Sequence, residues 1–194
     1  MKSVLLLGSI LLLSACGSMQ SQVVKKNVSF DPGIQAQIRS YGSYGSDLIR
    51  IYPETDCAKW EGTKRNAVNR RFVNGLPRKV RNISIGIPPT ELSRKTEKDT
   101  GFVFRDSYRE MVVSANQPVV LDGAFSSQTR NQHYSCRVAA SFTPKAGEAY
   151  EVRYLSEEEG CDIEVYHIGH EEKDGVRQTK KLTANYCAKP GTSF

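Results

Sequence analysis

The chain has 194 residues, with 27 lysines and arginines against 21 aspartates and glutamates, and a formal net charge of +6. This length is enough for one domain that buries a core without a structural metal. Beyond the first sixteen residues, no apolar run approaches the roughly 20 residues of a membrane-spanning helix, so we expect the rest of the chain to lie in water.

The N-terminus carries one positive charge at Lys2, followed by an apolar stretch over residues 4–13. This stretch is too short for a permanent transmembrane helix and is typical of an export signal that is removed. Two small residues, Ser14 and Ala15, come directly before Cys16. We therefore expect residues 1–15 to be a cleaved signal peptide.

The tetrapeptide Leu13-Ser14-Ala15-Cys16 resembles the lipobox of bacterial lipoproteins. The resemblance implies that a diacylglycerol is attached to Cys16, that cleavage follows Ala15, and that the new amine is acylated. Several acyl chains make an anchor that does not readily leave a membrane. Gly17 in place of aspartate implies, by the same resemblance, transfer to the outer membrane. The alternative is an ordinary secretory signal with an accidental cysteine.

Residues 17 to about 46 are polar and rich in glycine and serine. This composition predicts a flexible tether over residues 16–46, with at most one early strand near residues 27–30. The folded domain would then span residues 47–194.

From residue 47 onward, short alternating stretches are separated by proline, glycine and asparagine turns. The predicted strands cover residues 48–52, 80–87, 102–115, 118–125, 134–142, 149–155, 161–168 and 178–186. One short helix is expected within residues 65–72 or 91–98. About eight short strands and no long helical period predict an all-β fold, an antiparallel β-sandwich of immunoglobulin or transthyretin type.

Basic residues gather between residues 62 and 90, where no acidic residue occurs. They are Lys64, Arg65, Arg70, Arg71, Arg78, Lys79 and Arg81. Because apolar side chains are interleaved with them, this segment is the candidate partner-binding surface, for an envelope protein or an anionic glycan or lipid. The alternative is a solvated connection. Export makes nucleic acid an unsuitable partner.

Residues 142–152 and 161–165 resemble a hairpin that recurs in small β-sandwich lipoproteins of Gram-negative bacteria, many of unknown function. The match covers about a sixth of the chain and implies a fold rather than an activity. Turn residues Pro144 and Gly147, with Phe142 and Tyr150 at the core edge, explain the motif physically.

Four cysteines remain after Cys16: Cys57, Cys136, Cys161 and Cys187. An even number in an exported chain predicts two disulfides. A three-residue loop around Asp174 would place Cys161 opposite Cys187, whereas a two-residue Asp-Gly turn would send them to opposite faces but leave a cleaner apolar face. The preferred pairing is Cys161–Cys187 with Cys57–Cys136.

The sequence offers no nucleophile motif and no glycine-rich phosphate loop. His167 and His170, followed by Glu171 and Glu172, resemble a metal site, but a spacing of three sends the two rings to opposite faces of a regular strand. Trp60 is expected to pack over a disulfide as a small core. We therefore expect no catalytic residue, no metal and no cofactor.

These patterns together predict a non-enzymatic outer-membrane lipoprotein that faces the periplasm and has a binding or scaffolding role. The leading alternative is an immunity or inhibitor lipoprotein that neutralises a toxin or a lysozyme-like enzyme. In that case the acidic runs at residues 157–159 and 171–172 would face a basic cleft. An envelope hydrolase is a third hypothesis.

Overall fold

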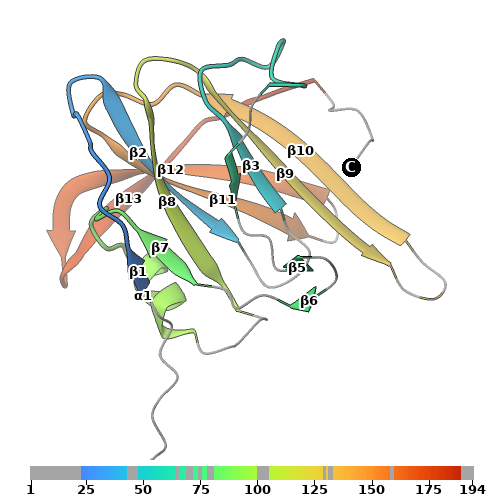
Figure 1. Cartoon of the computed structure of the whole chain (residues 1–194), viewed down its shortest axis with the longest axis horizontal. Coiled ribbons are helices and arrows are strands. Elements are labelled where there is room, and N and C mark those ends of the chain that lie inside the picture. Colours follow the sequence, from blue (N-terminus) through green and yellow to red (C-terminus); the bar gives the residue numbers. More distant parts are fainter. Residues whose placement is uncertain are drawn as a thin grey trace, which may run out of the picture.

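A computed structural model of the chain describes residues 23–42, 48–63, 66–68, 72–73, 76–77, 81–99, 105–128, 130, 133–157 and 160–188. These residues form fourteen strands and one helix (Figure 1). Eight of the strands are five residues or longer, which agrees with the predicted number. No helix in the described ranges has the length and apolarity needed to cross a membrane.

Two sheets pack face to face, as Figure 1 shows. The larger sheet has seven strands in the order β1-β7-β8-β2-β11-β12-β13. Their bounds are β1 Val23–Lys25, β7 Asn82–Ser84, β8 Ser107–Ser114, β2 Gln35–Gly42, β11 Ala149–Glu157, β12 Gly160–Lys173 and β13 Val176–Leu182. Three of its neighbouring pairs, β1–β7, β7–β8 and β2–β11, are parallel. The predicted all-β sandwich is therefore confirmed, but the larger sheet is mixed rather than purely antiparallel.

The smaller sheet has five strands in the order β14-β10-β9-β3-β4, all antiparallel. The strands are β14 Asn185–Tyr186, β10 His133–Phe142, β9 Val119–Gln128, β3 Leu48–Tyr52 and β4 Asn66–Val68. A separate pair joins β5 Phe72–Val73 to β6 Leu76–Pro77. The short strand at residues 66–68 replaces the helix considered within residues 65–72, whereas the alternative helix is confirmed as α1, Glu91–Lys98.

The core lies between the sheets and is built from the inward-facing residues of both. Ile38 and Val152 come from the larger sheet, Ile51 and Leu121 from the smaller one, and all four are fully buried. The two sheets approach closely at Gly123, where a Cβ would come 2.2 Å from Cδ2 of Tyr154. Phe142 meets the ring of Tyr150 edge-on at a centroid distance of 5.2 Å, which confirms the expected core edge.

The predicted tether is wrong for residues 23–42. Strand β2, at residues 35–42, lies inside the seven-stranded sheet between β8 and β11, with Ala36 and Ile38 fully buried. Residues 23–25 form edge strand β1, and residues 27–30 do not form the early strand that was expected there. The polar composition was misleading because Arg39 and Tyr41 in β2 are also buried, on the outer face of the sheet, where they bind carboxylates. Residues 16–22 and 43–47 lie outside the described ranges.

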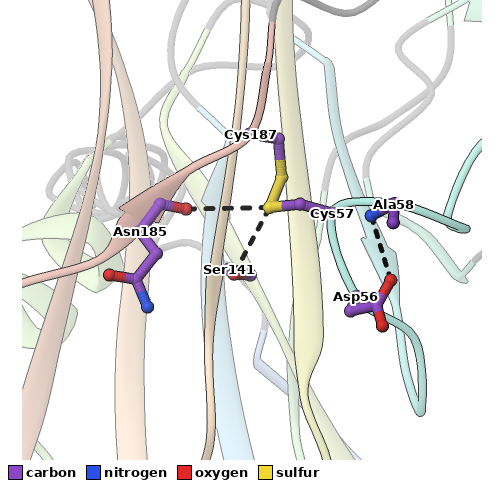
Figure 2. Close-up of a disulfide and its surroundings, with 6 residues drawn as sticks. All are labelled: Asp56, Cys57, Ala58, Ser141, Asn185 and Cys187. Carbon is purple, nitrogen blue, oxygen red and sulfur yellow. Dashed lines mark hydrogen bonds between the residues drawn. A yellow bond between two sulfur atoms is a disulfide. The ribbon is translucent and has the colours of Figure 1, made fainter.

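Both disulfides form, but the preferred pairing is wrong: the bridges are Cys57–Cys187 and Cys136–Cys161. The β12–β13 hairpin has the two-residue Asp174-Gly175 turn, since Lys173 pairs with Val176. Strand β13 then ends at residue 182, and the chain crosses to the smaller sheet, where β14 pairs with β10. Cys187 therefore reaches Cys57 in the turn after β3, near Ser141 (Figure 2).

The second bridge has a different mechanical role. Cys136 lies on β10 and Cys161 on β12, so this disulfide joins the two sheets covalently. The 57–187 bridge instead fixes the loop over residues 53–63, whose Trp60 packs with Tyr52, Val120, Ala139 and Cys187 on the outer face of the smaller sheet. The expected small core around Trp60 and a disulfide is confirmed.

Candidate binding cleft

The outer face of the seven-stranded sheet is lined with buried charge. In β2 the even-numbered residues Ala36 and Ile38 point into the core, so Arg39 and Tyr41 point to the opposite face. Arg39 lies directly between Glu110 of β8 and Glu151 of β11 in the register of the sheet. Its side chain is 2% exposed, and it forms ion pairs with Glu110 at 2.8 Å and Glu151 at 3.0 Å.

Glu110 binds a turn of backbone as well as Arg39. Its Oε2 accepts hydrogen bonds from the consecutive backbone N–H groups of Ile85, Gly86 and Ile87 at 2.7–3.1 Å, and from the Ser84 hydroxyl. Successive backbone N–H groups form a concave site for an anionic oxygen. Strand β7 ends at residue 84, shorter than the predicted 80–87, because these N–H groups bind the carboxylate instead of a neighbouring strand.

Glu151 holds the start of helix α1 against the sheet. Its Oε1 accepts hydrogen bonds from the hydroxyls of Tyr41 and Thr90, each at 2.5 Å. Thr90 is the N-cap of α1 and forms a capping box with Ser93. Burial and the adjacent Glu151 carboxylate raise the pKa of Tyr41 well above its usual value. Although burial alone would lower the pKa of Arg39, the nearby Tyr41, Glu110 and Glu151 raise it overall, so its charge is permanent.

A cleft of about 340 Å³ opens beside this network, between the start of α1, the outer sheet face and β13. The residues that line it are Thr90, Glu91, Leu92, Lys95, Glu151, Arg153, Tyr166, Val176, Arg177, Gln178 and Thr179. Its opening is fixed at one end because the Arg177 backbone N–H donates to the Pro89 carbonyl at 2.8 Å. The cleft therefore has walls held by backbone pairing and a floor of sheet side chains.

The floor of the cleft is organised around Glu164, which lies next to it on β12. Glu164 accepts hydrogen bonds from Arg153 at 2.5 Å, Lys181 at 2.7 Å and Tyr166 at 3.0 Å. Burial opposes the charged form, but the bonds from Lys181, Arg153 and Tyr166 lower the pKa of Glu164 overall. Arg153 also lies over the Tyr166 ring at 5.0 Å and donates to its hydroxyl. These side chains are consequently pre-positioned rather than free to rotate.

The cationic side chain best placed for a ligand is Lys95 on α1. It lines the cleft, is exposed, and has no ion-pair partner among the residues that the structure describes. Arg153 is saturated by Glu164 and Tyr166, and Arg177 donates to the His170 carbonyl. The arrangement can therefore accept an anionic group at Lys95 above a polar, partly aromatic floor.

The predicted basic surface lies almost entirely outside the described residues. No side-chain placement is described for Lys64, Arg65, Arg70, Arg71, Arg78 or Lys79. Arg81, directly before β7, is exposed. Cys16 also lies outside the described ranges, so its lipidation remains a prediction.

The two histidines of the candidate metal site approach the same carboxylate. A β-bulge between Ile168 and Glu172 breaks the regular alternation, and Nε2 of His167 and of His170 lie 2.5 Å and 3.8 Å from Oε2 of Glu148. No group of three or more potential ligands within the described ranges has a geometry that could hold a metal ion. Glu171 and Glu172 are exposed at the hairpin tip.

A second buried network lies on the outer face of the smaller sheet. Asp122 is fully buried and pairs with Arg50 at 2.7 Å and Arg137 at 2.8 Å. Arg137 also lies over the Trp60 ring, 5.4 Å from its centroid. The loop over residues 53–63 covers this network through Trp60. The network therefore holds the loop in place and does not line a cleft.

Comparison with known proteins gives no further guide: no protein-family model, no curated protein and no solved structure matches the chain.

Sequence reasoning missed the floor of the cleft and the network beside it because their charged strand residues occupy alternating positions that normally face water. Glu151 and Arg153 in the floor, and Arg39 in the adjacent network, fit that pattern. A usable signal is the presence of oppositely charged residues at such positions in several strands. Only the register shows that Arg39 lies between two carboxylates.

Proposed function

We propose that this protein is a non-enzymatic lipoprotein, anchored through Cys16 in the outer membrane and facing the periplasm, with a binding or scaffolding role. The lipobox residues before Cys16 and the four paired cysteines support export to an oxidising compartment. The observation that carries the binding role is the cleft beside α1, with its unpaired Lys95 above a fixed polar floor.

The chemistry of the cleft favours an anionic group on a polar ligand, such as a carboxylate of an envelope protein or glycan. Lys95 supplies the positive charge, and Gln178, Thr179 and Tyr166 supply hydrogen-bonding groups around it. Since α1 and β13 are tied to the sheet by Thr90 and Arg177, little backbone entropy would be lost in these two elements on binding.

A binding role is favoured over catalysis by the state of the buried carboxylates. Glu110, Asp122, Glu151 and Glu164 are the buried acidic residues in the described ranges, and each forms an ion pair with an arginine. A carboxylate held in this way orders the fold instead of exchanging protons with a substrate. The envelope hydrolase hypothesis therefore has the least support.

Site-specific photo-crosslinking in the native envelope tests the proposal. A photoreactive amino acid at Gln178, inside the cleft, should give a discrete adduct that Lys95→Glu abolishes. The same probe at Gln117, an exposed turn residue, is the matched control and should give none. Identical adducts at both positions, or an adduct unaffected by Lys95→Glu, would remove the cleft from consideration. Charge reversal of Arg70, Arg71, Arg78 and Lys79 in the same assay tests the basic segment separately.

The immunity or inhibitor role remains a second proposal, supported by the exposed tip of the β12–β13 hairpin. Glu171, Glu172 and Asp174 project there and could enter a basic cleft of a target enzyme. A photoreactive residue at Glu171 would then give the adduct instead of one at Gln178. A gene for a secreted effector next to this one would favour the same conclusion.

A further inference from the structure

The first described strand lies only a short distance from the proposed anchor. Val23 begins β1, which pairs in parallel with β7 at one edge of the seven-stranded sheet. Val23 is seven positions after Cys16, so even a fully extended chain between them would span at most about 25 Å. The edge of the domain at Val23 must therefore stay within that distance of any lipid attached to Cys16.

The strand directions show which other segments share this end of the molecule. Strands β1, β7 and β8 run parallel, so they all begin at the same end. Helix α1 finishes there too, because the Asp99 carboxylate after the helix accepts a hydrogen bond from the Asp106 backbone just before β8. Figure 1 shows β1 and α1 together at this end of the sheet.

Four exposed cations belong to these elements: Lys25 ends β1 and Lys26 follows it, Arg81 directly precedes β7, and Lys98 ends α1. None of them has an ion-pair partner in the part of the chain that the structure describes. Val28, just after β1, is 48% exposed. We call this set the β1 basic edge. Charged residues at an exposed sheet edge also prevent further strand pairing, but that role does not require lysine at the end of α1.

We propose that the β1 basic edge is a membrane-contact surface that binds acidic phospholipid headgroups and fixes the orientation of the domain. This inference rests on the proposed lipid anchor at Cys16, which would hold these cations near the bilayer at high effective concentration. Each cation close to an anionic surface strengthens the contact about fivefold. The turns at residues 115–118 and 144–147 lie at the opposite end of the sandwich, because Asn116 bonds the Pro144 carbonyl beyond the end of β8, and they would face away from the membrane.

Lysine footprinting of the native full chain tests this orientation without a mutation. The protein is purified from membranes, reconstituted in vesicles containing phosphatidylglycerol, and treated with an amine-acylating reagent. Acylation rates are read by peptide mass spectrometry and compared with rates in detergent micelles. We expect Lys25, Lys26 and Lys98 to react at least about fivefold more slowly in the vesicles. Lys145, which is exposed and lies in the turn at the opposite end of the sandwich, is the matched control and should not change.

Further comparisons test whether the protection of these lysines depends on charge or only on their distance from the membrane. Protection should be weaker in phosphatidylcholine vesicles and should fall at high salt, and Lys25→Glu with Lys26→Glu should lower the protection of Lys98. Equal rates at all four lysines, or protection of Lys145 instead, would overturn the inference. The mass of the N-terminal peptide from the same sample tests the lipid anchor separately from the orientation. An unacylated Cys16 overturns the proposed anchor and this inference with it. An acylated Cys16 with uniform lysine labelling overturns the orientation alone.

Discussion

Replacing Arg39 with methionine removes the cation at the centre of the outer-face network and keeps a side chain of similar length. The substitution leaves Glu110 and Glu151 buried, each 3% exposed, without the guanidinium that pairs with both. It also removes the two donors to the Ile87 and Pro88 carbonyls, at 2.8 and 3.0 Å, which hold the segment leading into α1.

The magnitude follows from the type of interaction broken. Removing one partner of a buried ion pair costs about 3–5 kcal/mol, because the remaining charge stays buried without compensation. A domain of this size loses about 2–4 °C in melting temperature per kcal/mol. Arg39→Met should therefore lower the melting temperature by roughly 6–20 °C, with the segment at residues 85–99 losing hydrogen-exchange protection first.

Urea unfolding at neutral pH, followed by circular dichroism, measures this cost. The matched control is Arg130→Met, since Arg130 is exposed, and its free energy of unfolding should stay within about 0.5 kcal/mol of the natural protein. Adding Glu110→Gln and Glu151→Gln to Arg39→Met should recover part of the loss by removing both uncompensated charges. An Arg39→Met protein within 1 kcal/mol of the natural one, with an unchanged m-value, would refute the assignment of this network as the support of α1.

Three further predictions concern other parts of the fold. The hydrogen bond with His167 lowers the pKa of Glu148. Its stabilising effect is therefore complete above the unfolded carboxyl pKa of about 4.3 and is lost as the pH falls through the lower folded value. Glu148→Gln should lower the urea midpoint at pH 6, and the difference should shrink as the pH falls below about 4.3; an offset that is constant with pH would contradict this. Gly123→Ala should destabilise the domain by about 1–3 kcal/mol through its clash with Tyr154, and the cost should shrink in a Tyr154→Leu background. Non-reducing peptide mapping should recover the pairs Cys57–Cys187 and Cys136–Cys161. By loop length, removing the first bridge should cost about 5 kcal/mol and the second about 3.5, as measured by urea unfolding.

Strands with one apolar face were predictable from the sequence. Residues 48–52, 134–142 and 149–155 alternate regularly, and the structure has strands there. Strand β2 was missed because its two faces are buried in different ways. Ile38 enters the apolar core, whereas Arg39 and Tyr41 are buried on the outer face, where they bind carboxylates more than 70 residues away in the sequence. The local sequence of β2 does not show which distant residues its charged and tyrosine side chains will contact. From the sequence alone, β2 therefore looks the same as a solvent-exposed segment.

The disulfide connectivity depends on the same long-range information. The two-residue turn at Asp174 was one of two registers that the sequence left open, and it is the one that the structure has. What the local sequence does not encode is the departure of the chain from the larger sheet after residue 182, which brings residues 185–186 beside β10. Because Cys136 then lies across the core from Cys161, and Cys187 lies beside Cys57, each bridge connects elements that no hairpin joins. Turn chemistry determines local register, but the pairing of distant cysteines follows from which sheet each strand enters.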